Sequence, residues 1–408
     1  MVCDVSSRPQ RNDGVRTISR GFARDANRAA IFATILTRGP LSRSDIARET
    51  GLSAATVSKV VKPLVDDGYV AELPETSGIP GRPSVPVAVN PTRASALGFK
   101  LTATHLTGVL VDLRSNVLAT STRRLRSTEP SHVVTAIAEM AQRLPAQAGG
   151  AGEVLGIGIG IGGHVSHDSR VVKYATFLGW RDLAFADLVE ASTGLEVLIE
   201  NDVDALAVAE QWFGLGQGVS TFALITVGAG VGSAYVVNDV LMHGASGLAG
   251  ELGHLLIARD GDRCVCGNRG CLETVASESA ILRRIEEHDP SAAGIDFSEA
   301  IERALAGDAA ARKAFQRAGD ALGIGVSAIL NLLNPELVLI SGEGLAAREL
   351  LLGPMRAAIA RHTFSSAATD CRFEFAPHGA DTWARGAAAL VLHTLISRSA
   401  RLGGGATV

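Results

Sequence analysis

The sequence has no long apolar segment of the kind that crosses a membrane. None of its apolar runs reaches the length of 18 or more residues that a membrane-spanning helix requires without charge or glycine. The first 20 residues include basic side chains but lack the apolar core of a secretory signal. We therefore expect a cytoplasmic protein with no membrane segment.

The chain also lacks an excess of basic residues and has few cysteines. Its formal net charge of −4 excludes a protein that coats nucleic acid non-specifically, so DNA binding would have to come from a local surface. Its 408 residues, 47% hydrophobic and 20% charged, are ordinary for two or three globular domains. Of the five cysteines, three fall within eight residues, which in a cytosolic chain indicates a metal before disulfides.

The composition changes along the chain and divides it into parts. Residues 1–24 carry five Arg against two Asp, which predicts a flexible tail. Residues 25–90 have the pattern of three helices and two short strands. Beyond them, Gly-rich strands at 154–163 and 222–237 alternate with helical stretches. This alternation predicts an α/β domain, and the two Gly-rich strand regions suggest two lobes with a cleft between them.

Residues 41–70 carry the pattern of a helix-turn-helix. Ser42 and Asp45 form the spacing of a capping box at the start of one helix. Gly51 is placed to end that helix, and Ser53 is placed to cap the next one. Two short helices joined by a tight turn are therefore expected.

The second of these helices has two distinct faces. Its predicted apolar stripe consists of Val57, Val60, Val61 and Leu64. On the other face, small and hydroxyl residues let the backbone approach a major groove, and lysines can meet phosphates. The predicted DNA-contacting residues are Ala54, Ala55, Thr56, Ser58, Lys59 and Lys62. An ordinary helical hairpin has the same caps and stripe, but the segment that follows favours DNA binding.

That following segment predicts a wing. YVAEL and VPVAVN are expected strands, and the loop between them presents Arg82 between a glycine and a proline. Such a guanidinium suits a narrow minor groove, although an exposed arginine on a turn can equally be solvated.

Residues 25–90 hold seven basic and seven acidic side chains. Because the non-specific phosphate attraction is then small, tight operator binding needs two copies, and we expect a homodimer or homotetramer.

A cysteine cluster is the most specific feature of the chain. Cys264, Cys266 and Cys271 lie in a glycine-containing loop, and His254 is the nearest histidine. Three thiolates and one imidazole make a closed tetrahedral set, which predicts a structural zinc ion with no open coordination position. The alternative is three buried free thiols beside an unrelated histidine.

The stretch LITVGAGVGSAYVVNDVLMHGASGLAGELGH, followed by CVCGNRGCLE, resembles the ROK family of bacterial repressors and sugar kinases. The resemblance covers about residues 95–395. It implies a two-lobed actin-like ATPase fold preceded, as in the family's repressors, by a winged helix-turn-helix at 25–90. Lobe 1 would span 95–212, completed by a C-terminal helix at 382–398. Lobe 2 would span 213–381 and contain the zinc-binding loop.

The resemblance also implies a sugar site between the lobes. Carried over position by position, its residues are Gly163, Asn201, Asp202, Glu251, His254 and Glu273. Carboxylates and amides suit sugar hydroxyls, and one ring nitrogen of His254 could serve zinc while the other serves the sugar. Asn201 and Asp202 also stand where a helix starts, so a capping role is an alternative that does not exclude sugar binding.

The kinase chemistry of the family is not expected here. The family's kinases use an Asp at position 202 as general base and a D-x-G-G-T turn for phosphate and magnesium. In this sequence Lys100 stands in place of that turn's Asp, and Thr102 and Ala103 replace its glycines. Magnesium then loses its anchor, and Cβ atoms stand where phosphate must approach the backbone. A second glycine loop, residues 228–232, is retained.

The sequence thus predicts a non-enzymatic, sugar-responsive DNA-binding transcriptional regulator, most simply a repressor. Its partners would be double-stranded operator DNA and a sugar or sugar derivative. Two alternatives stay open. One is an active ATP-dependent sugar kinase with a fused DNA-binding domain, against which Lys100 argues. The other is a ligand-independent repressor with a vestigial cleft, against which the retained polar positions argue.

Overall fold

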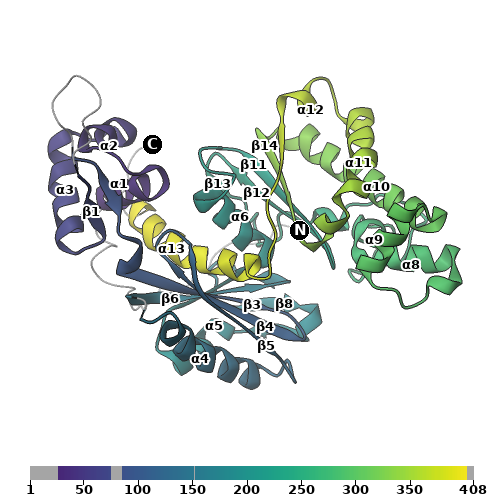
Figure 1. Ribbon diagram of the computed structural model, residues 1–408, viewed down its shortest axis with the longest axis horizontal. Coiled ribbons are helices and arrows are strands. Elements are labelled where there is room, and N and C mark those ends of the chain that lie inside the picture. The colour runs from purple at the N-terminus through teal and green to yellow at the C-terminus, as the bar shows by residue number, and fades with distance from the viewer. Residues whose placement is uncertain (1–25, 75–84, 151, 402–408) are drawn as a thin grey trace, which may run out of the picture.

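The computed structural model describes residues 26–74, 85–150 and 152–401, with side chains described up to residue 394. A small helical unit lies at one end, and two β-sheets with flanking helices form the rest (Figure 1). None of the helices in these ranges is long and apolar enough to cross a membrane.

The N-terminal unit is a winged helix-turn-helix. The predicted capping box is present, because Asp45 N donates to Ser42 Oγ at 3.1 Å and Ser42 N donates to the Asp45 carboxylate at 3.4 Å. Gly51 ends the first of the two predicted helices in the left-handed region, with φ of 68°, and the predicted apolar stripe of the second is buried. Its two strands pair antiparallel. The elements are α1 (Ala26–Arg38), α2 (Arg43–Thr50), α3 (Ala54–Asp66), β1 (Val70–Glu72) and β2 (Val87–Val89).

The first large sheet has the strand order β10-β6-β3-β4-β5. Strands β10, β6 and β3 are parallel, and β4 and β5 add antiparallel pairs. Helices α4 and α5 pack on one face against alternate apolar residues of the strands, and α13 covers the other face (Figure 1). The bounds are β3 (Ala94–Leu101), β4 (His105–Asp112), β5 (Val117–Arg124), β6 (Glu153–Ile161), β10 (Val197–Asn201), α4 (Pro130–Gln147), α5 (Phe185–Thr193), α6 (Asp202–Phe213) and α13 (Thr382–Arg401). A small sheet beside it comprises β7 (His164–Val165), β8 (Val172–Ala175) and β9 (Trp180–Leu183).

Glycines let α13 lie directly on this sheet. A Cβ at Gly98 would lie 2.0 Å from the carbonyl oxygen of Ala384, and one at Gly158 would lie 1.8 Å from that of Ala387. Since no side chain fits at such distances, the Gly-rich strands serve close packing of helix on sheet. The C-terminal helix therefore lies on the first sheet, while the domain boundaries given above stay predictions.

The second large sheet has the order β13-β12-β11-β14-β15 and carries most of the remaining helices. Its long helix α10 packs against α11 and α8. The bounds are β11 (Phe222–Val227), β12 (Val231–Val237), β13 (Val240–Leu241), β14 (Leu337–Ser341), β15 (Arg372–Phe375), α7 (Glu273–Ala276), α8 (Glu278–His288), α9 (Phe297–Ala306), α10 (Ala309–Leu333), α11 (Arg348–His362) and α12 (Ala367–Asp370). Short 3₁₀ helices occur at Pro91–Arg93, Thr176–Leu178, Leu252–His254, Pro290–Ala292 and Glu343–Ala347.

The winged helix-turn-helix shares a hydrophobic core with the first sheet. Ile35 of α1 belongs to one buried cluster with Val111 of β4 and with Ala388 and Val391 of α13. Helix α1 packs directly against α13. The N-terminal unit is thus attached to the first large sheet through the C-terminal helix.

Candidate functional site

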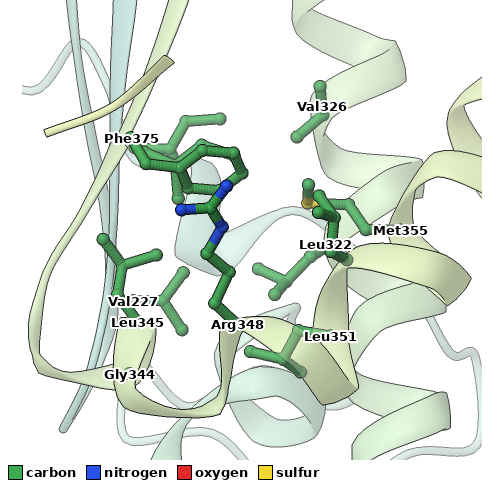
Figure 2. Close-up of a pocket in the computed structure, with 12 residues that line it drawn as sticks. Val227, Leu322, Val326, Gly344, Leu345, Arg348, Leu351, Met355 and Phe375 are labelled. Atoms are coloured by element: carbon green, nitrogen blue, oxygen red, sulfur yellow. The ribbon is translucent and has the colours of Figure 1, made fainter. Parts of the chain in front are cut away.

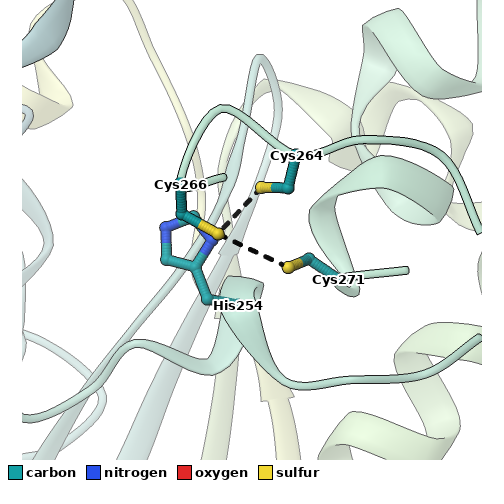
Figure 3. Close-up of side chains that lie close together, drawn as sticks. All are labelled: His254, Cys264, Cys266 and Cys271. Atoms are coloured by element: carbon teal, nitrogen blue, oxygen red, sulfur yellow. Dashed lines mark hydrogen bonds between the residues drawn. The ribbon is translucent and has the colours of Figure 1, made fainter. Parts of the chain in front are cut away.

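The predicted metal ligands converge in the structure. The ligand atoms of His254, Cys264, Cys266 and Cys271 all lie within 4.8 Å of one another, and Figure 3 shows the four side chains facing a common centre. Cys264 Sγ is 3.5 Å from His254 Nδ1, and the sulfurs of Cys266 and Cys271 are 3.7 Å apart. This cluster could hold a metal ion.

The donor set fits a tetrahedral ion. Zn–S bonds of about 2.3 Å in tetrahedral geometry separate two ligand sulfurs by about 3.8 Å, close to the 3.7 Å of Cys266 and Cys271. Burial raises the pKa of Cys271 to about 12, so this thiol ionises near neutral pH only when a cation stabilises the thiolate. Gly270, at φ of 71°, turns the loop where a Cβ would strike the Ala258 carbonyl oxygen at 1.6 Å.

The second ring nitrogen of His254 points away from the sulfurs. Its Nε2 lies 3.7 Å from the carboxylate of Glu251, while its Nδ1 faces Cys264. The imidazole therefore stands between the cysteine cluster and an exposed acid that the sequence assigned to the sugar site. The two ring nitrogens of His254 thus face different groups, and their use for zinc and for a sugar stays a prediction.

Asn201 connects the start of α6 to the loop after β6. Its Oδ1 accepts from the backbone N–H groups of Val203 at 2.8 Å and Asp204 at 3.3 Å, which is a helix cap. Its Nδ2 donates to the carbonyl oxygen of Gly163 at 3.1 Å. Two of the predicted sugar-site residues are thus in contact, and the capping alternative for Asn201 is confirmed.

Lys100 occupies a position that sequence reasoning did not foresee. Its ammonium forms an ion pair with the carboxylate of Asp202 and lies 4.9 Å from the centroid of the Trp383 ring. The side chains of the ion pair are only 15% and 13% exposed. Beyond it, Thr102 closes the β3–β4 turn by accepting and donating hydrogen bonds with His105. An ammonium therefore fills the end of β3, next to the carboxylate of Asp202.

Two carboxylates face the retained glycine loop between β11 and β12. A Cβ at Gly228 would lie 2.6 Å from Glu343 Oε2, and one at Gly230 would lie 2.7 Å from Glu273 Oε2. Glu273 also accepts a hydrogen bond from Val231 N at 3.3 Å. The carboxylates of Glu343 and Glu273 therefore lie directly against the backbone of this glycine loop.

Glu343 is held in place by two aromatic neighbours. Trp383 Nε1 donates to its Oε1 at 2.9 Å, and His378 Nε2 lies 3.3 Å from the same oxygen. Burial opposes ionisation, but hydrogen bonds from His378 and Trp383 outweigh it and lower the pKa of Glu343 to about 2. The carboxylate is therefore negative at any physiological pH. No local pattern indicates this contact, because Glu343 and Trp383 are 40 residues apart.

An apolar pocket lies beside the turn that contains Glu343. Figure 2 shows Arg348 reaching into it, with its guanidinium carbon 4.0 Å from the centroid of the Phe375 ring. The cavity volume is only about 20 Å³, so no ligand larger than a water molecule fits beside this side chain. The lining residues are Ile225, Val227, Leu322, Val326, Ile340, Gly344, Leu345, Arg348, Leu351, Leu352, Met355 and Phe375.

The predicted DNA-contacting face of α3 is largely open to solvent. Ala54, Ala55, Ser58, Lys59 and Lys62 are exposed, whereas Thr56 is half-buried and its hydroxyl is 2.9 Å from Ser53 Oγ. Arg82 lies outside the described residues, as does the loop that carries it.

Ion pairs leave two lysines of this unit available. Among residues 26–74 and 85–90, the four arginines pair with Asp67, Glu49, Glu72 and Asp45. No ion pair is found for Lys59 or Lys62 within the described chain, and both stand on the exposed face of α3. Their charges are therefore not neutralised by the part of the protein that the structure describes.

Comparisons with known proteins agree with this geometry. The model of the ROK family matches residues 96–394, and a winged helix-turn-helix DNA-binding model matches residues 24–71. The xylose repressor of Bacillus subtilis (strain 168) is 28% identical over 348 residues, which cover 84% of this chain and 89% of the relative. A crystal structure of a ROK family transcriptional regulator, a homologue of the E. coli MLC protein, has a TM-score of 0.80 at 28% identity, covering 92% of this chain and 98% of that one.

A kinase of the same fold matches less of the chain. A ROK family glucokinase from Streptomyces griseus, solved with glucose and AMPPNP, has a TM-score of 0.63 at 29% identity and covers 72% of this chain and 98% of that one. The predicted fold class, a two-lobed actin-like α/β fold behind a winged helix-turn-helix, is confirmed. The protein described here is a member of the ROK family.

Proposed function

We propose that the chain is a sugar-responsive DNA-binding transcriptional repressor that has lost the kinase activity of its family. The winged helix-turn-helix and the name of the Bacillus subtilis relative, a xylose repressor, support the regulatory role. The observation that carries the loss of kinase activity is the Lys100–Asp202 ion pair. An ammonium at the end of β3 repels magnesium and ties up the carboxylate that would otherwise act as base.

The sugar effector would bind between the lobes. We assign its contacts to the predicted set of Gly163, Asn201, Asp202, Glu251, His254 and Glu273. Two contacts support this assignment. The Asn201–Gly163 hydrogen bond joins two separate segments of the set, and the Glu251–His254 contact places two side chains of a third segment together. Asp202 would accept a hydrogen bond from a sugar hydroxyl while its charge stays balanced by Lys100.

The cysteine cluster would hold a structural zinc ion. His254, Cys264, Cys266 and Cys271 supply the closed set of four N and S ligands that such sites use. With four protein ligands the ion would have no open position and would contribute stability rather than chemistry. Because His254 also faces Glu251, zinc would fix the orientation of one sugar-binding side chain.

Operator binding would use α3 and the wing. The unpaired charges of Lys59 and Lys62 support phosphate contacts at the edge of a major groove, and Arg82 remains a proposed minor-groove contact. With a balanced charge in this unit, two copies on one double-stranded operator supply the affinity that one copy lacks. We therefore propose a homodimer or a pair of dimers as the active form.

One experiment separates a regulator from a kinase. Full-length protein is titrated by fluorescence anisotropy into the DNA upstream of its own gene, with and without a panel of pentoses, hexoses, amino sugars and their phosphate esters. ATP turnover with magnesium is followed in parallel by a coupled assay. We expect one sugar class to change DNA affinity at least tenfold, with no turnover above background.

Asp202→Ala tests the role of the cleft. This variant should lose the effect of the sugar while its sugar-free DNA affinity stays unchanged, and Glu302→Ala, an exposed acid on α9, should behave as the unaltered protein. Turnover that disappears in Asp202→Ala would establish a kinase instead. Tight operator binding that no sugar alters would establish a ligand-independent repressor.

A further inference from the structure

A second cluster of ligating side chains lies where the two lobes meet. Glu200 ends β10, Asp204 is in the first turn of α6, and His243 follows β13 in the other lobe. Their ligand atoms all lie within 4.8 Å of one another, and His243 Nε2 is 3.1 Å from Glu200 Oε2. None of these three residues belongs to the cysteine cluster or to the proposed sugar contacts.

The carboxylate of Asp204 is the unusual member of this cluster. Asp204 is 6% exposed, and the imidazole of His243 is the basic group beside its carboxylate. Glu200, at 8% exposed, accepts from Asn201 N and contacts His243. One imidazole therefore faces two mostly buried carboxylates. Because uncompensated buried charge is unfavourable in general, a cation or a proton at this position would be stabilising.

The surrounding charges favour a cation. Glu200, Asp202 and Glu251 all add negative potential at Asp204. Lys100, the nearby ammonium, is already paired with Asp202. Taken together, the charged groups that face Asp204 from both lobes therefore carry a net negative charge, and one imidazole stands among them.

The ligand chemistry narrows the kind of cation. Two carboxylates and one imidazole, without a thiolate, suit harder first-row divalent ions such as Mn²⁺, whereas the four-ligand cysteine site suits Zn²⁺. Metal bonds of about 2.1 Å at right angles separate neighbouring ligand atoms by about 3.0 Å, which matches the 3.1 Å between His243 and Glu200.

We propose that Glu200, Asp204 and His243 form a second metal site, for a divalent cation of the Mn²⁺ class, that joins the two lobes. Asp204 lies on α6, which packs between the two sheets. Glu200 ends a strand of the first sheet, and His243 belongs to a segment that follows a strand of the second. That segment also contacts the first lobe through Ser246, whose carbonyl oxygen is 2.6 Å from His164 Nε2. A bound cation would therefore stabilise one arrangement of the lobes. The site does not depend on the proposed function.

The test uses zinc-loaded full-length protein, so that the cysteine cluster is already filled. Mn²⁺ is titrated at pH 7.5, free Mn²⁺ is counted by electron paramagnetic resonance, and the melting temperature is recorded with and without Mn²⁺. The variants are Asp204→Asn, which keeps the shape and removes the charge, and His243→Gln. Glu302→Gln, on the exposed face of α9, is the matched control.

We expect one Mn²⁺ per chain in the unaltered protein and the control, with a higher melting temperature. Both cluster variants should bind it at least about tenfold more weakly while keeping their zinc and their circular dichroism spectrum. Equal Mn²⁺ binding by Asp204→Asn, or none by the unaltered protein, would overturn the proposal. If the unaltered protein binds no Mn²⁺, Asp204 carries a proton instead, because burial raises its pKa well above the usual range. Asp204→Asn would then leave the melting temperature unchanged.

Discussion

At the scale of single residues, the proposed loss of kinase chemistry depends on position 100. A carboxylate there would hold magnesium in a kinase, whereas the ammonium of Lys100 binds Asp202 and lies against Trp383. That a basic residue stands at this position is evident from the sequence. The ion pair could not be predicted from it, because its partners are 102 residues apart and meet only when α6 packs beside β3.

The ion pair should contribute measurably to stability. Lys100→Met keeps the apolar stem but leaves the mostly buried Asp202 carboxylate without its partner, so we expect a loss of about 3 kcal/mol in the free energy of unfolding. Asp202→Asn should also destabilise, and the double variant should lose clearly less than the sum of the two. Urea unfolding of the four proteins measures this coupling, and additive losses would show that the pair contributes nothing.

At the scale of elements, local patterns were the most predictable part of the protein. The capping box at Ser42, the glycine that ends α2 and the stripe of α3 each depend on neighbours within a few residues. The cysteine ligands also follow from local spacing. By contrast, the carboxylate of Glu343 at the glycine loop and the cluster around Asp204 depend on tertiary packing. Sequence periodicity carries no signal for such contacts.

The metal-binding loop should need its ion to stay folded. Purified full-length protein is expected to contain about one zinc per chain, and Cys266→Ser should bind it at least tenfold more weakly, with a lower melting temperature. Elemental analysis and thermal melts provide the measurements. Cys371→Ala, a change of a buried thiol remote from the cluster, should retain full zinc content, and an unaltered zinc content in Cys266→Ser would remove this residue from the ligand set.

Lys59 and Lys62 of α3 should strengthen operator binding by contacting DNA phosphates. Replacing Lys59 or Lys62 by alanine removes a charge that no acid of the described chain neutralises. The dependence of log affinity on log salt should therefore become shallower by about 0.9 for each DNA phosphate that the variant no longer neutralises. The salt dependence of operator binding, measured by anisotropy, tests this. Lys313→Ala, an exposed lysine on α10, is the control, and an unchanged slope for both α3 variants would place the DNA elsewhere.

At the scale of the whole molecule, two helices run side by side from the cleft toward the DNA-binding unit. Asp202 and Trp383 both contact Lys100 near the starts of α6 and α13. Further along, Gly386 lies against the backbone of Leu206, and the rings of Trp212 and His393 are 5.1 Å apart. Because α13 also packs against α1, we expect a movement at the cleft that shifts either helix to change the face on which α1 packs.

A methyl group beneath α13 should disturb this arrangement. Gly98→Ala places a Cβ 2.0 Å from a backbone oxygen of α13, so the helix must move off the sheet, at a cost of about 1–3 kcal/mol or more. The variant should lose stability and respond more weakly to the sugar in operator binding, with its zinc content unchanged. Gly353→Ala on α11 meets no atom outside its chain neighbours. Because Pro354 follows and disfavours a Cβ in the helical region, we expect a small loss of stability, well below that of Gly98→Ala, and an unchanged response to the sugar. Equal behaviour of the two variants would contradict the role given to α13.

The core that joins α1, β4 and α13 has a consequence for how such proteins can be recombined. A winged helix-turn-helix is usually regarded as a DNA-binding domain that can be exchanged between proteins. Here, cutting the chain after residue 90 would expose the apolar side of α1. It would also expose the apolar surface of α13 against which α1 packs. A chimaera that gives this chain a new operator specificity should therefore graft only the solvent-facing residues of α3, and keep the buried side chains of α1 that the C-terminal helix already fits.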